Sequence, residues 1–174
     1  RNFQFLTAKP FVVVVNVDEN DIQGEKAPGI DQLKTYCSER SIPLQVLPAK
    51  IEQEISELDG DERQMFMEEL GIKSSGLEVL TRLVYEKLNL ISFFTVGEDE
   101  VKAWTINRGT NARKAAGKIH SDIERGFIRA EVIEYDSFVA AGSMAAARDN
   151  GTLRLEGKEY IVKDGDIVHF RFNV

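Results

Sequence analysis

The sequence has little cysteine and histidine: one Cys and two His among 174 residues. Cys37 has no internal partner for a disulfide, which suits the reducing cytoplasm. Its helical surroundings predict a residue that is either packed in the core or half exposed. The chain holds no Cys/His cluster with zinc-site spacing and no Ser/His/Asp arrangement typical of a hydrolase. We therefore do not expect a metal site. No apolar run reaches the about 18 residues of a membrane-spanning helix, so we do not expect a membrane contact either.

Both ends of the chain lack familiar signals. The sequence begins at Arg1 without a start methionine or the apolar region of a signal peptide, so we interpret it as cut from a larger protein. We also do not expect a ubiquitin-like or sulfur-carrier protein, because these need a flexible Gly-Gly tail that this sequence does not show. Residues 171–174 read Arg-Phe-Asn-Val and directly follow a predicted strand, which excludes that class.

A third absence decides most of the interpretation. The phosphate-loop motif Gly-x-x-x-x-Gly-Lys-[Ser/Thr] does not occur, because the stretch Gly71-Ile-Lys-Ser74 lacks the first Gly and the spacing. Without this loop there is no nest of N–H groups for phosphates, no Lys for the β- and γ-oxygens and no hydroxyl for magnesium. We therefore do not expect this chain alone to hydrolyse a nucleotide.

The strongest positive signal is the apolar run from Phe11 to Val15, which is followed by Asn16 and, three residues later, by Glu19. Five apolar residues, four of them β-branched, predict a strand covered on both faces, as in a parallel sheet. Ligands of open α/β sheets bind beyond the carboxyl ends of such strands. An Asn three residues before a carboxylate at this place is the pattern with which G-domain NTPases hold a nucleotide base.

The net charge of −7 is unevenly distributed. Residues 1–88 carry 10 basic and 16 acidic side chains, whereas residues 89–174 carry 12 basic and 13 acidic ones. Within the second half, residues 101–130 hold seven basic and two acidic side chains, a local charge of +5. Such a segment is typical of a contact with a phosphate backbone and, equally, of a solvated face of mixed charge.

The order of periodic segments indicates two parts with a boundary near Asn89. In the first part, the pattern predicts parallel strands at 11–16 and 42–47 around a helix at 30–40, then helices at 49–58, 61–70 and 75–88. In the second part, it predicts a hairpin of 90–96 and 101–106, a helix at 111–120, a strand at 127–133, one or two helices within 135–150, and strands at 153–155, 160–162 and 167–172. The expected helix caps are Ser74 or Ser75, with Glu78 bonding back, and Thr110.

Several blocks of the sequence closely resemble the C-terminal half of the Obg-like ATPase (YchF) family of P-loop NTPases. They are residues 5–10, 16–19, 48–52, 101–106, 116–132 and 155–173. The first four read Phe-Leu-Thr-Ala-Lys-Pro, Asn-Val-Asp-Glu, Pro-Ala-Lys-Ile-Glu and Val-Lys-Ala-Trp-Thr-Ile. The last two are long and specific, and together the blocks extend over essentially the whole chain.

The resemblance implies an α/β fold. Residues 1–88 would be the C-terminal part of a P-loop NTPase G domain (a βαβ unit plus helices), with 1–9 as the end of an inserted helical arm. Residues 89–174 would be an α+β, β-grasp TGS domain. The complete protein would be a cytoplasmic, ribosome-associated NTP hydrolase. It would use ATP, possibly also GTP, with Mg²⁺ bound through residues absent here, and would contact the ribosome or RNA through TGS. The oligomeric state stays open.

By the same resemblance, Asn16, Val17 and Glu19 replace the Asn-Lys-x-Asp that reads guanine in most G domains. Adenine offers an acceptor at N1 and no N2 amino group, so a carboxylate aimed there would stay unpaired. A longer Glu19 that turns to water avoids that cost of about 1–3 kcal/mol. Asn16 can pair with N6–H and N7 of adenine while Val17 packs on the ring. This interpretation predicts that ATP is used at least as well as GTP.

The segment Pro48-Ala-Lys50 matches the Ser-Ala-Lys loop of G domains, which contacts the base through backbone N–H groups. Ala49 and Lys50 are therefore the remaining expected base contacts. A helix start with Pro in its first turn would give the same pattern.

In the second part, six basic residues are the candidates for RNA or ribosome contact: Lys102, Arg108, Arg113, Lys114, Lys118 and Arg125. His120 is expected to be a structural cap, because no nucleophile or metal ligand accompanies it. The aromatic residues at strand spacing are expected to be mostly core: Phe93, Phe94, Trp104, Phe127, Phe138, Phe170 and Phe172.

Two functions from different classes stay open. In the first, this chain is the base-binding end and TGS domain of a ribosome-associated ATPase whose chemistry is supplied by a segment absent here. In the second, it is a stand-alone β-grasp module that binds RNA or protein and has no nucleotide function. An upstream phosphate-binding segment that restores ATP turnover would separate the two.

Overall fold

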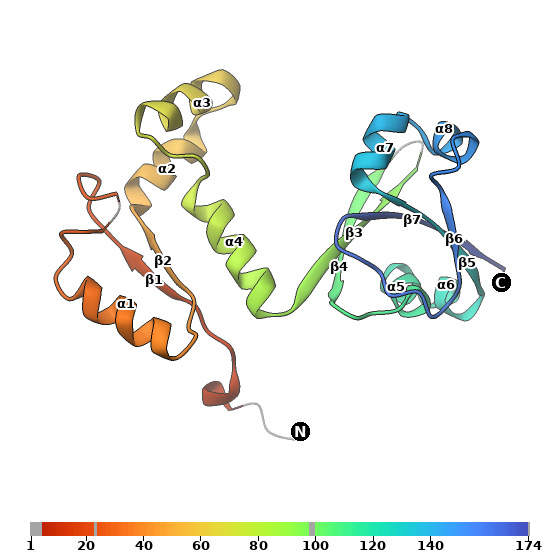
Figure 1. Ribbon diagram of the computed structural model, residues 1–174, viewed down its shortest axis with the longest axis horizontal. Coiled ribbons are helices and arrows are strands. Elements are labelled where there is room, and N and C mark those ends of the chain that lie inside the picture. Colours follow the sequence, from red (N-terminus) through yellow and green to blue (C-terminus); the bar gives the residue numbers. More distant parts are fainter. Residues whose placement is uncertain (1–4, 23, 98–99, 174) are drawn as a thin grey trace. The chain divides into compact units, whose positions relative to one another are not determined.

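A computed structural model describes residues 5–22, 24–97 and 100–173 (Figure 1). The chain divides into two compact units, one extending to Leu88 and one beginning at Asn89. Each unit has its own sheet, with two strands in the first and five in the second. The assignment of the two units to particular domain families stays a prediction.

The first unit begins with a parallel strand pair. Its elements are η1 (Leu6–Ala8), β1 (Val13–Asn16), α1 (Ile30–Glu39), β2 (Leu44–Leu47), α2 (Ala49–Glu57), α3 (Gly60–Glu69) and α4 (Gly76–Lys87). β1 pairs in parallel with β2, so that Val13 lies opposite Leu44 and Asn16 opposite Leu47. The predicted βαβ unit is confirmed, and both strands end at the same edge of the sheet.

The prediction that the first strand is covered on both faces is wrong for the described chain. Burial alternates along β1, Val14 keeps 44% of its surface exposed, and Phe11, which precedes the strand, keeps 58%. Among the described residues, β1 lies in a sheet of two strands, β1 and β2, which is too narrow for other elements to cover both of its faces. Cys37, by contrast, is buried in α1 as expected.

The cap predicted for the fourth helix is half right. The Ser75 hydroxyl accepts a hydrogen bond from the backbone N–H of Glu78 at 3.2 Å, as an N-cap should. Glu78 does not bond back to Ser75, because its carboxylate pairs with Arg63 of α3 at 3.0 Å.

The second unit is a mixed five-stranded sheet with helices on both faces. Its elements are β3 (Leu90–Val96), β4 (Val101–Asn107), α5 (Ala112–Ile119), α6 (Ser121–Arg125), β5 (Phe127–Glu134), α7 (Tyr135–Ala141), α8 (Met144–Asp149), β6 (Arg154–Glu156) and β7 (Asp166–Phe172). The strand order is β4-β3-β7-β5-β6, in which β3 and β7 are parallel and the other neighbours antiparallel. The predicted hairpin is confirmed, although residues 98–99 of its turn lie outside the described residues.

The side chains of the central strands alternate between two hydrophobic clusters. The larger cluster joins Phe93, Val132 and Phe170 to the buried alanines of α5. The smaller one places Ile133 and Ile167 against α7 and α8. Most of the aromatic residues expected in the core are buried or partly buried there, but Phe172 is 46% exposed and that expectation is wrong.

Three local predictions need correction in the second unit. Asn111, not Thr110, caps α5, because its side chain accepts from the N–H of Lys114 at 3.0 Å while the Thr110 hydroxyl donates to the Asn107 carbonyl. The helix expected at 111–120 ends at Ile119, and α6 follows. The strand expected at 160–162 is reduced to an isolated bridge between Asn111 and Ile161.

Candidate functional site

The carboxyl ends of β1 and β2 are joined by one side chain. The side-chain carbonyl oxygen of Asn16, the last residue of β1, accepts a hydrogen bond from the backbone N–H of Ala49 at 2.9 Å. Ala49 is the first residue of α2, directly after the end of β2 and Pro48. Two of the segments predicted to read a base are thereby held together although 33 residues separate them.

A second contact joins the same segments. The Lys50 ammonium forms an ion pair with the carboxylate of Glu19, whose side chain is 37% exposed. The hydrogen bond and charge of Glu19 raise the pKa of Lys50. The expectation that Glu19 turns to water is therefore corrected, since its carboxylate is directed to Lys50.

A hollow of about 380 Å³ lies beside the end of β1. It is lined by Asn16, Val17, Asp18, Asn20, Asp21, Lys26, Ala27 and Pro28. Of the five predicted base-contact residues, Asn16 and Val17 line this hollow, whereas Glu19, Ala49 and Lys50 do not. Two contacts thus link the β1 segment, which carries Asn16, Val17 and Glu19, to Ala49 and Lys50, but only the first two of these residues line the hollow.

In the loop that follows β1, the Asp21 side chain holds the backbone of residues 25 and 26. The Asp21 carboxylate accepts from the N–H groups of Glu25 and Lys26, each at 2.9 Å. Hydrogen bonds from the backbone and side chain of Asn20 lower the pKa of Asp18. Sequence reasoning missed that this loop lines the hollow, although an Asp followed by Gly and Pro was a recognisable turn signal. The lining residues from the loop are Asn20, Asp21, Lys26, Ala27 and Pro28.

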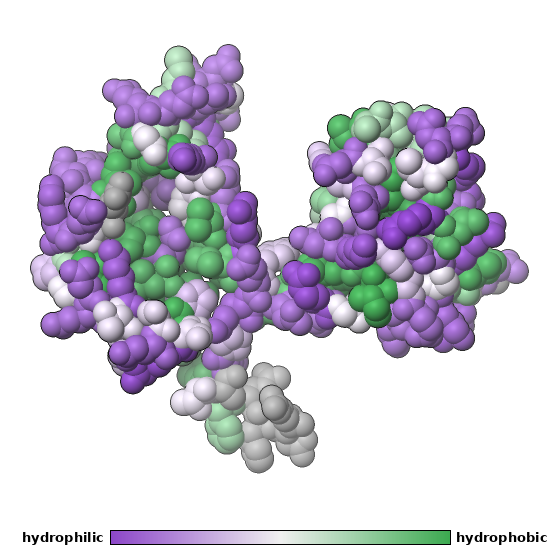
Figure 2. Space-filling model, in the orientation of Figure 1, coloured by the Kyte–Doolittle hydropathy of each residue, from purple (hydrophilic) through white to green (hydrophobic). Residues whose placement is uncertain are grey.

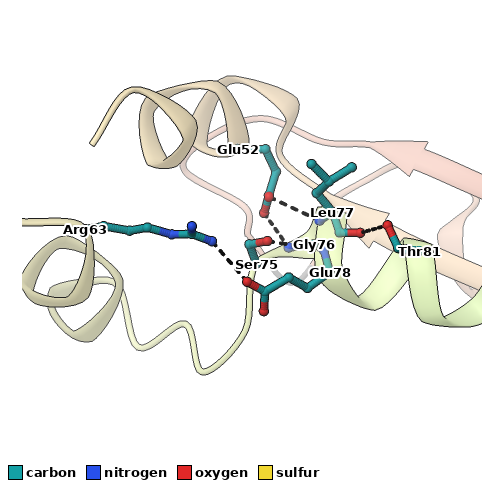
Figure 3. Close-up of polar contacts among 7 residues, drawn as sticks. All are labelled: Glu52, Arg63, Ser75, Gly76, Leu77, Glu78 and Thr81. Carbon is teal, nitrogen blue, oxygen red and sulfur yellow. Dashed lines mark hydrogen bonds and ion pairs between the residues drawn. The ribbon is translucent and has the colours of Figure 1, made fainter. Parts of the chain in front are cut away.

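The first turn of α2 is tied to α4 by a carboxylate. Glu52 accepts from the backbone N–H of Gly76 at 2.6 Å and from that of Leu77 at 3.2 Å (Figure 3). Both N–H groups belong to the first turn of α4, where they have no acceptor within the helix and a negative charge is stabilising. Glu52 lies two residues after Lys50 on α2. Its contact with α4 therefore helps to orient α2, whose first residues, Ala49 and Lys50, are predicted base contacts.

Four of the six basic residues predicted to contact RNA lie on α5 and α6. Lys114 pairs with Glu124 at 2.7 Å, and this contact lowers the pKa of Glu124. Arg113 donates from Nε to the carbonyl of Glu124 at 3.2 Å, and Arg125 pairs with Asp122. Lys114 and Lys118 share the lining of a cavity of about 560 Å³. These four residues form the α5–α6 basic surface, which carries two acidic groups among its cations.

The other two predicted RNA contacts lie on the β3–β4 hairpin. Lys102 lies over the ring of Trp104, with its Nζ 4.7 Å from the ring centroid. It is opposite Thr95, whereas Asn107, the neighbour of Arg108, is opposite Leu90. Lys102 and Asn107 are five residues apart along β4, which is about 17 Å. Lys102 and Arg108 are therefore not brought together.

His120 has the structural role expected of it. It is the C-cap of α5 and the N-cap of α6, where its Nδ1 accepts from the N–H of Asp122 at 3.2 Å.

Within the described ranges, no three His, Cys, Asp or Glu side chains are arranged to hold a metal ion. No helix over the same ranges is long and apolar enough to cross a membrane.

Two buried polar clusters of the second unit were not predicted. In the first, the carboxylate of Glu131 accepts from Arg148 and Arg171. In the second, the Tyr160 hydroxyl donates to Asp166 at 2.7 Å. The partners come from different strands, helices and loops, so no spacing in the sequence could have indicated them.

Comparison with known proteins identifies the family. A family model named YchF-GTPase_C, described as a protein of unknown function (DUF933), matches residues 90–173. The Ribosome-binding ATPase YchF of Bacillus subtilis is 48% identical over 100% of this chain, which spans 48% of that protein. The chain belongs to the YchF family of Obg-like ATPases. Obg-like ATPase 1 of Gallus gallus is 40% identical over 97% of the chain and 43% of its own length.

The fold of the YchF family is matched in solved structures. The Schizosaccharomyces pombe YchF GTPase superposes with a TM-score of 0.84 and 34% identity, covering 95% of this chain and 44% of that one. A GTP binding protein from Pyrococcus horikoshii, 19% identical with a TM-score of 0.60, shares the fold. The chain thus spans about half the length of the YchF proteins it matches, and it corresponds to their C-terminal portion.

Proposed function

We propose that this chain is the base-recognition end and the RNA- or ribosome-contacting module of a YchF-type ATPase. The proposal is carried by the hydrogen bond from Ala49 to Asn16. It brings two segments with base-reading sequence patterns to one edge of a parallel sheet, where ligands of such sheets bind. The hydrolytic machinery would belong to the other half of the longer protein, because the phosphate-loop motif is absent from this sequence.

In this proposal, Asn16 reads the edge of a purine. Its Oδ1 already accepts from Ala49, so its Nδ2 is the group that donates to N7, while the second lone pair of Oδ1 accepts from N6–H of adenine. The N–H of Ala49 then orients Asn16 instead of contacting the base, and the N–H of Lys50 is the remaining backbone donor. Val17, which lines the hollow, would pack on the ring.

ATP preference would follow from the position of Glu19. Guanine recognition needs a carboxylate directed to N1–H and N2–H, and here the carboxylate of Glu19 is paired with Lys50. A base with an acceptor at N1 then meets no unpaired negative charge. ATP is the proposed nucleotide, GTP a weaker ligand, and Mg²⁺ would be bound by groups of the longer protein.

The exposed apolar side chains of the first unit support the proposal that further elements of a complete G domain cover it. Apolar side chains gather over the middle of this unit, between α1 and α4 (Figure 2). Phe11 and Val14 are also exposed, although the sequence predicts a strand covered on both faces. Among the described residues, β1 has β2 as its sheet neighbour. A further strand and layer of a complete G domain would cover such an edge and face.

The second unit is proposed to be a TGS domain of the β-grasp type. Its hairpin, helix and mixed sheet with parallel β3 and β7 agree with that assignment. RNA or ribosome contact is proposed for the α5–α6 basic surface, with Lys102 and Arg108 as separate contacts on the hairpin. The relatives named ribosome-binding ATPases support this partner class, and a cytoplasmic location remains a prediction.

The test is a chimera in which this chain replaces the matching half of the Bacillus subtilis relative. We expect ATP turnover by the chimera and none by the 174-residue chain alone. In the chimera, Asn16→Ala should raise the Kd for ATP about tenfold, the loss of one or two net hydrogen bonds, whereas Gln32→Ala on the outer side of α1 should leave it unchanged. Unchanged ATP affinity in the Asn16 variant would favour the stand-alone binding module instead.

A further inference from the structure

A second hollow, of about 580 Å³, lies on the sheet face of the second unit that carries α7 and α8. Side chains on β5 and β7 alternate, so this face is the opposite of the one that packs on α5. Val96, Phe138 and Met144 supply an apolar wall, and Glu131, Arg148 and Arg171 supply the polar side. The α5–α6 basic surface therefore does not contribute to this hollow.

One buried carboxylate orders the polar side. Glu131 is 5% exposed and accepts from Nε and Nη2 of Arg171 at 3.2 and 3.3 Å. It also accepts from Nη2 of Arg148 at 3.2 Å. Burial raises the pKa of this carboxyl, but the hydrogen bond and charge of Arg171, with Arg148, outweigh it, so the pKa is lowered and the group stays ionised.

The two guanidinium groups keep capacity for a ligand. Their side chains are 56% and 47% exposed, and each uses at most two of its five N–H donors on Glu131. Two positive groups against one carboxylate leave a net positive charge. Arg129 adds to it, because it lies directly opposite Arg171 in the register of β5 and β7. Cross-strand neighbours of this kind share a face of the sheet.

We propose that this hollow binds single-stranded RNA, with one base against Phe138 and Met144 and its flanking phosphates on Arg148, Arg171 and Arg129. Guanidinium groups pair with phosphate oxygens in the fixed geometry that Glu131 imposes, and unstacked bases bind against aromatic and apolar side chains. The volume falls within the range of small-molecule sites. An acidic peptide would satisfy the charges but would leave the apolar wall without a planar group.

This inference rests on the RNA association proposed above and adds a binding site on the opposite face of the sheet from the α5–α6 basic surface. The whole 174-residue chain would be titrated into a fluorescein-labelled single-stranded RNA of about ten nucleotides, read by anisotropy. Arg148→Met and Arg171→Met should each weaken binding about five- to tenfold and flatten its salt dependence. Arg82→Met, on α4 of the first unit, is the matched control and should have no effect.

A second variant leaves the arginines in place. Met144→Glu puts a carboxylate into the rim of the hollow at the first residue of α8, where an acid is compatible with the helix. Met144→Glu should weaken RNA binding at least as much as Arg148→Met or Arg171→Met does. Circular dichroism would verify that each variant is folded.

Three results would overturn the inference. If Arg113→Met weakens binding while the Arg148, Arg171 and Met144 variants do not, RNA lies on the α5–α6 basic surface, and the proposed function stands without this site. If an acidic peptide displaces the label better than unlabelled RNA does, the ligand class is wrong. If the wild-type chain does not bind RNA at all, both the inference and the RNA association fail.

Discussion

The side-chain oxygen of Asn16 lies 2.9 Å from the backbone nitrogen of Ala49 and accepts its hydrogen bond. The backbone N–H of Ala49 was expected to contact the base, because Pro48-Ala-Lys50 matches the Ser-Ala-Lys loop of G domains, but here it donates to Asn16. This hydrogen bond also fixes the rotation of the Asn16 amide, because only Oδ1 can accept, so the Nδ2 group must point elsewhere. In the proposed base recognition, the loop after β2 would therefore orient Asn16 as well as contact the base directly.

Replacing Asn16 by Asp tests this orientation. Asp keeps an acceptor for Ala49 but has no N–H to donate to a purine. We expect the fold to be retained, with a change in unfolding free energy below about 1 kcal/mol, and ATP affinity in the chimera to fall as far as in Asn16→Ala. Isothermal titration and urea unfolding measure the two quantities. Normal ATP affinity in the Asp variant would show that Nδ2 does not contact the base.

The base preference is predicted to depend on three residues. In the chimera, Val17→Lys with Glu19→Asp restores the guanine-reading pattern and shortens the carboxylate so that it no longer reaches Lys50. We expect the ratio of GTP to ATP turnover to rise about tenfold or more, since the carboxylate can then accept from N1–H and N2–H. Lys50→Met should raise the ratio less, by freeing Glu19. A ratio unaffected by both changes would contradict the proposed base reading.

The cap between α2 and α4 is predicted to stabilise the first unit. Glu52→Ala removes the acceptor of two N–H groups at the start of α4 and should lower the free energy of unfolding by about 1–2 kcal/mol. Gly76→Ala should act similarly, because an added Cβ would lie 2.9 Å from the Glu52 carboxylate and 3.0 Å from Cβ of Leu47. Denaturant unfolding measures both. The matched control is Glu54→Ala on the same helix, which should change little.

The stability of the second unit is predicted to depend on pH through Tyr160. Burial and the hydrogen bond to Asp166 raise its pKa to about 12, above the value of about 10 in an unfolded chain. A raised pKa stabilises the folded state fully below about pH 10, and this contribution is lost as pH rises towards the folded pKa. Tyr160→Phe should therefore be less stable by about 1 kcal/mol at neutral pH, and the difference should disappear above the folded pKa.

Unfolding curves of wild type and Tyr160→Phe over this pH range supply the measurement. The phenolate absorbance gives an independent reading, since the variant should lack the titration of the tyrosine whose pKa is raised to about 12. An early-titrating Tyr160 would show that its bond to Asp166 is not maintained in solution.

Local regularities of the sequence were sufficient for much of the fold. The apolar run before Asn16, the helical stripe after Ser75 and the hairpin signal around Gly97 each involve neighbours along the chain, and each element was found. The errors at Thr110 and at 160–162 are also local. At the start of α5, the cap is Asn111, the residue after Thr110, and Asn is as good a cap as Thr. At 160–162, a strand was predicted, but the chain forms a turn in which the Asp166 carboxylate accepts from the N–H of Lys163.

The sequence by itself determined the order of the elements, the family and which polar residues follow the first two strands. Only the tertiary structure decided what those residues contact: Asn16 with Ala49, Glu19 with Lys50, and Glu131 with two arginines from different elements. The reason is physical. Periodicity and capping depend on residues a few positions apart, whereas the partner of a charged side chain depends on which distant segments the packing of the sheet brings within hydrogen-bond distance.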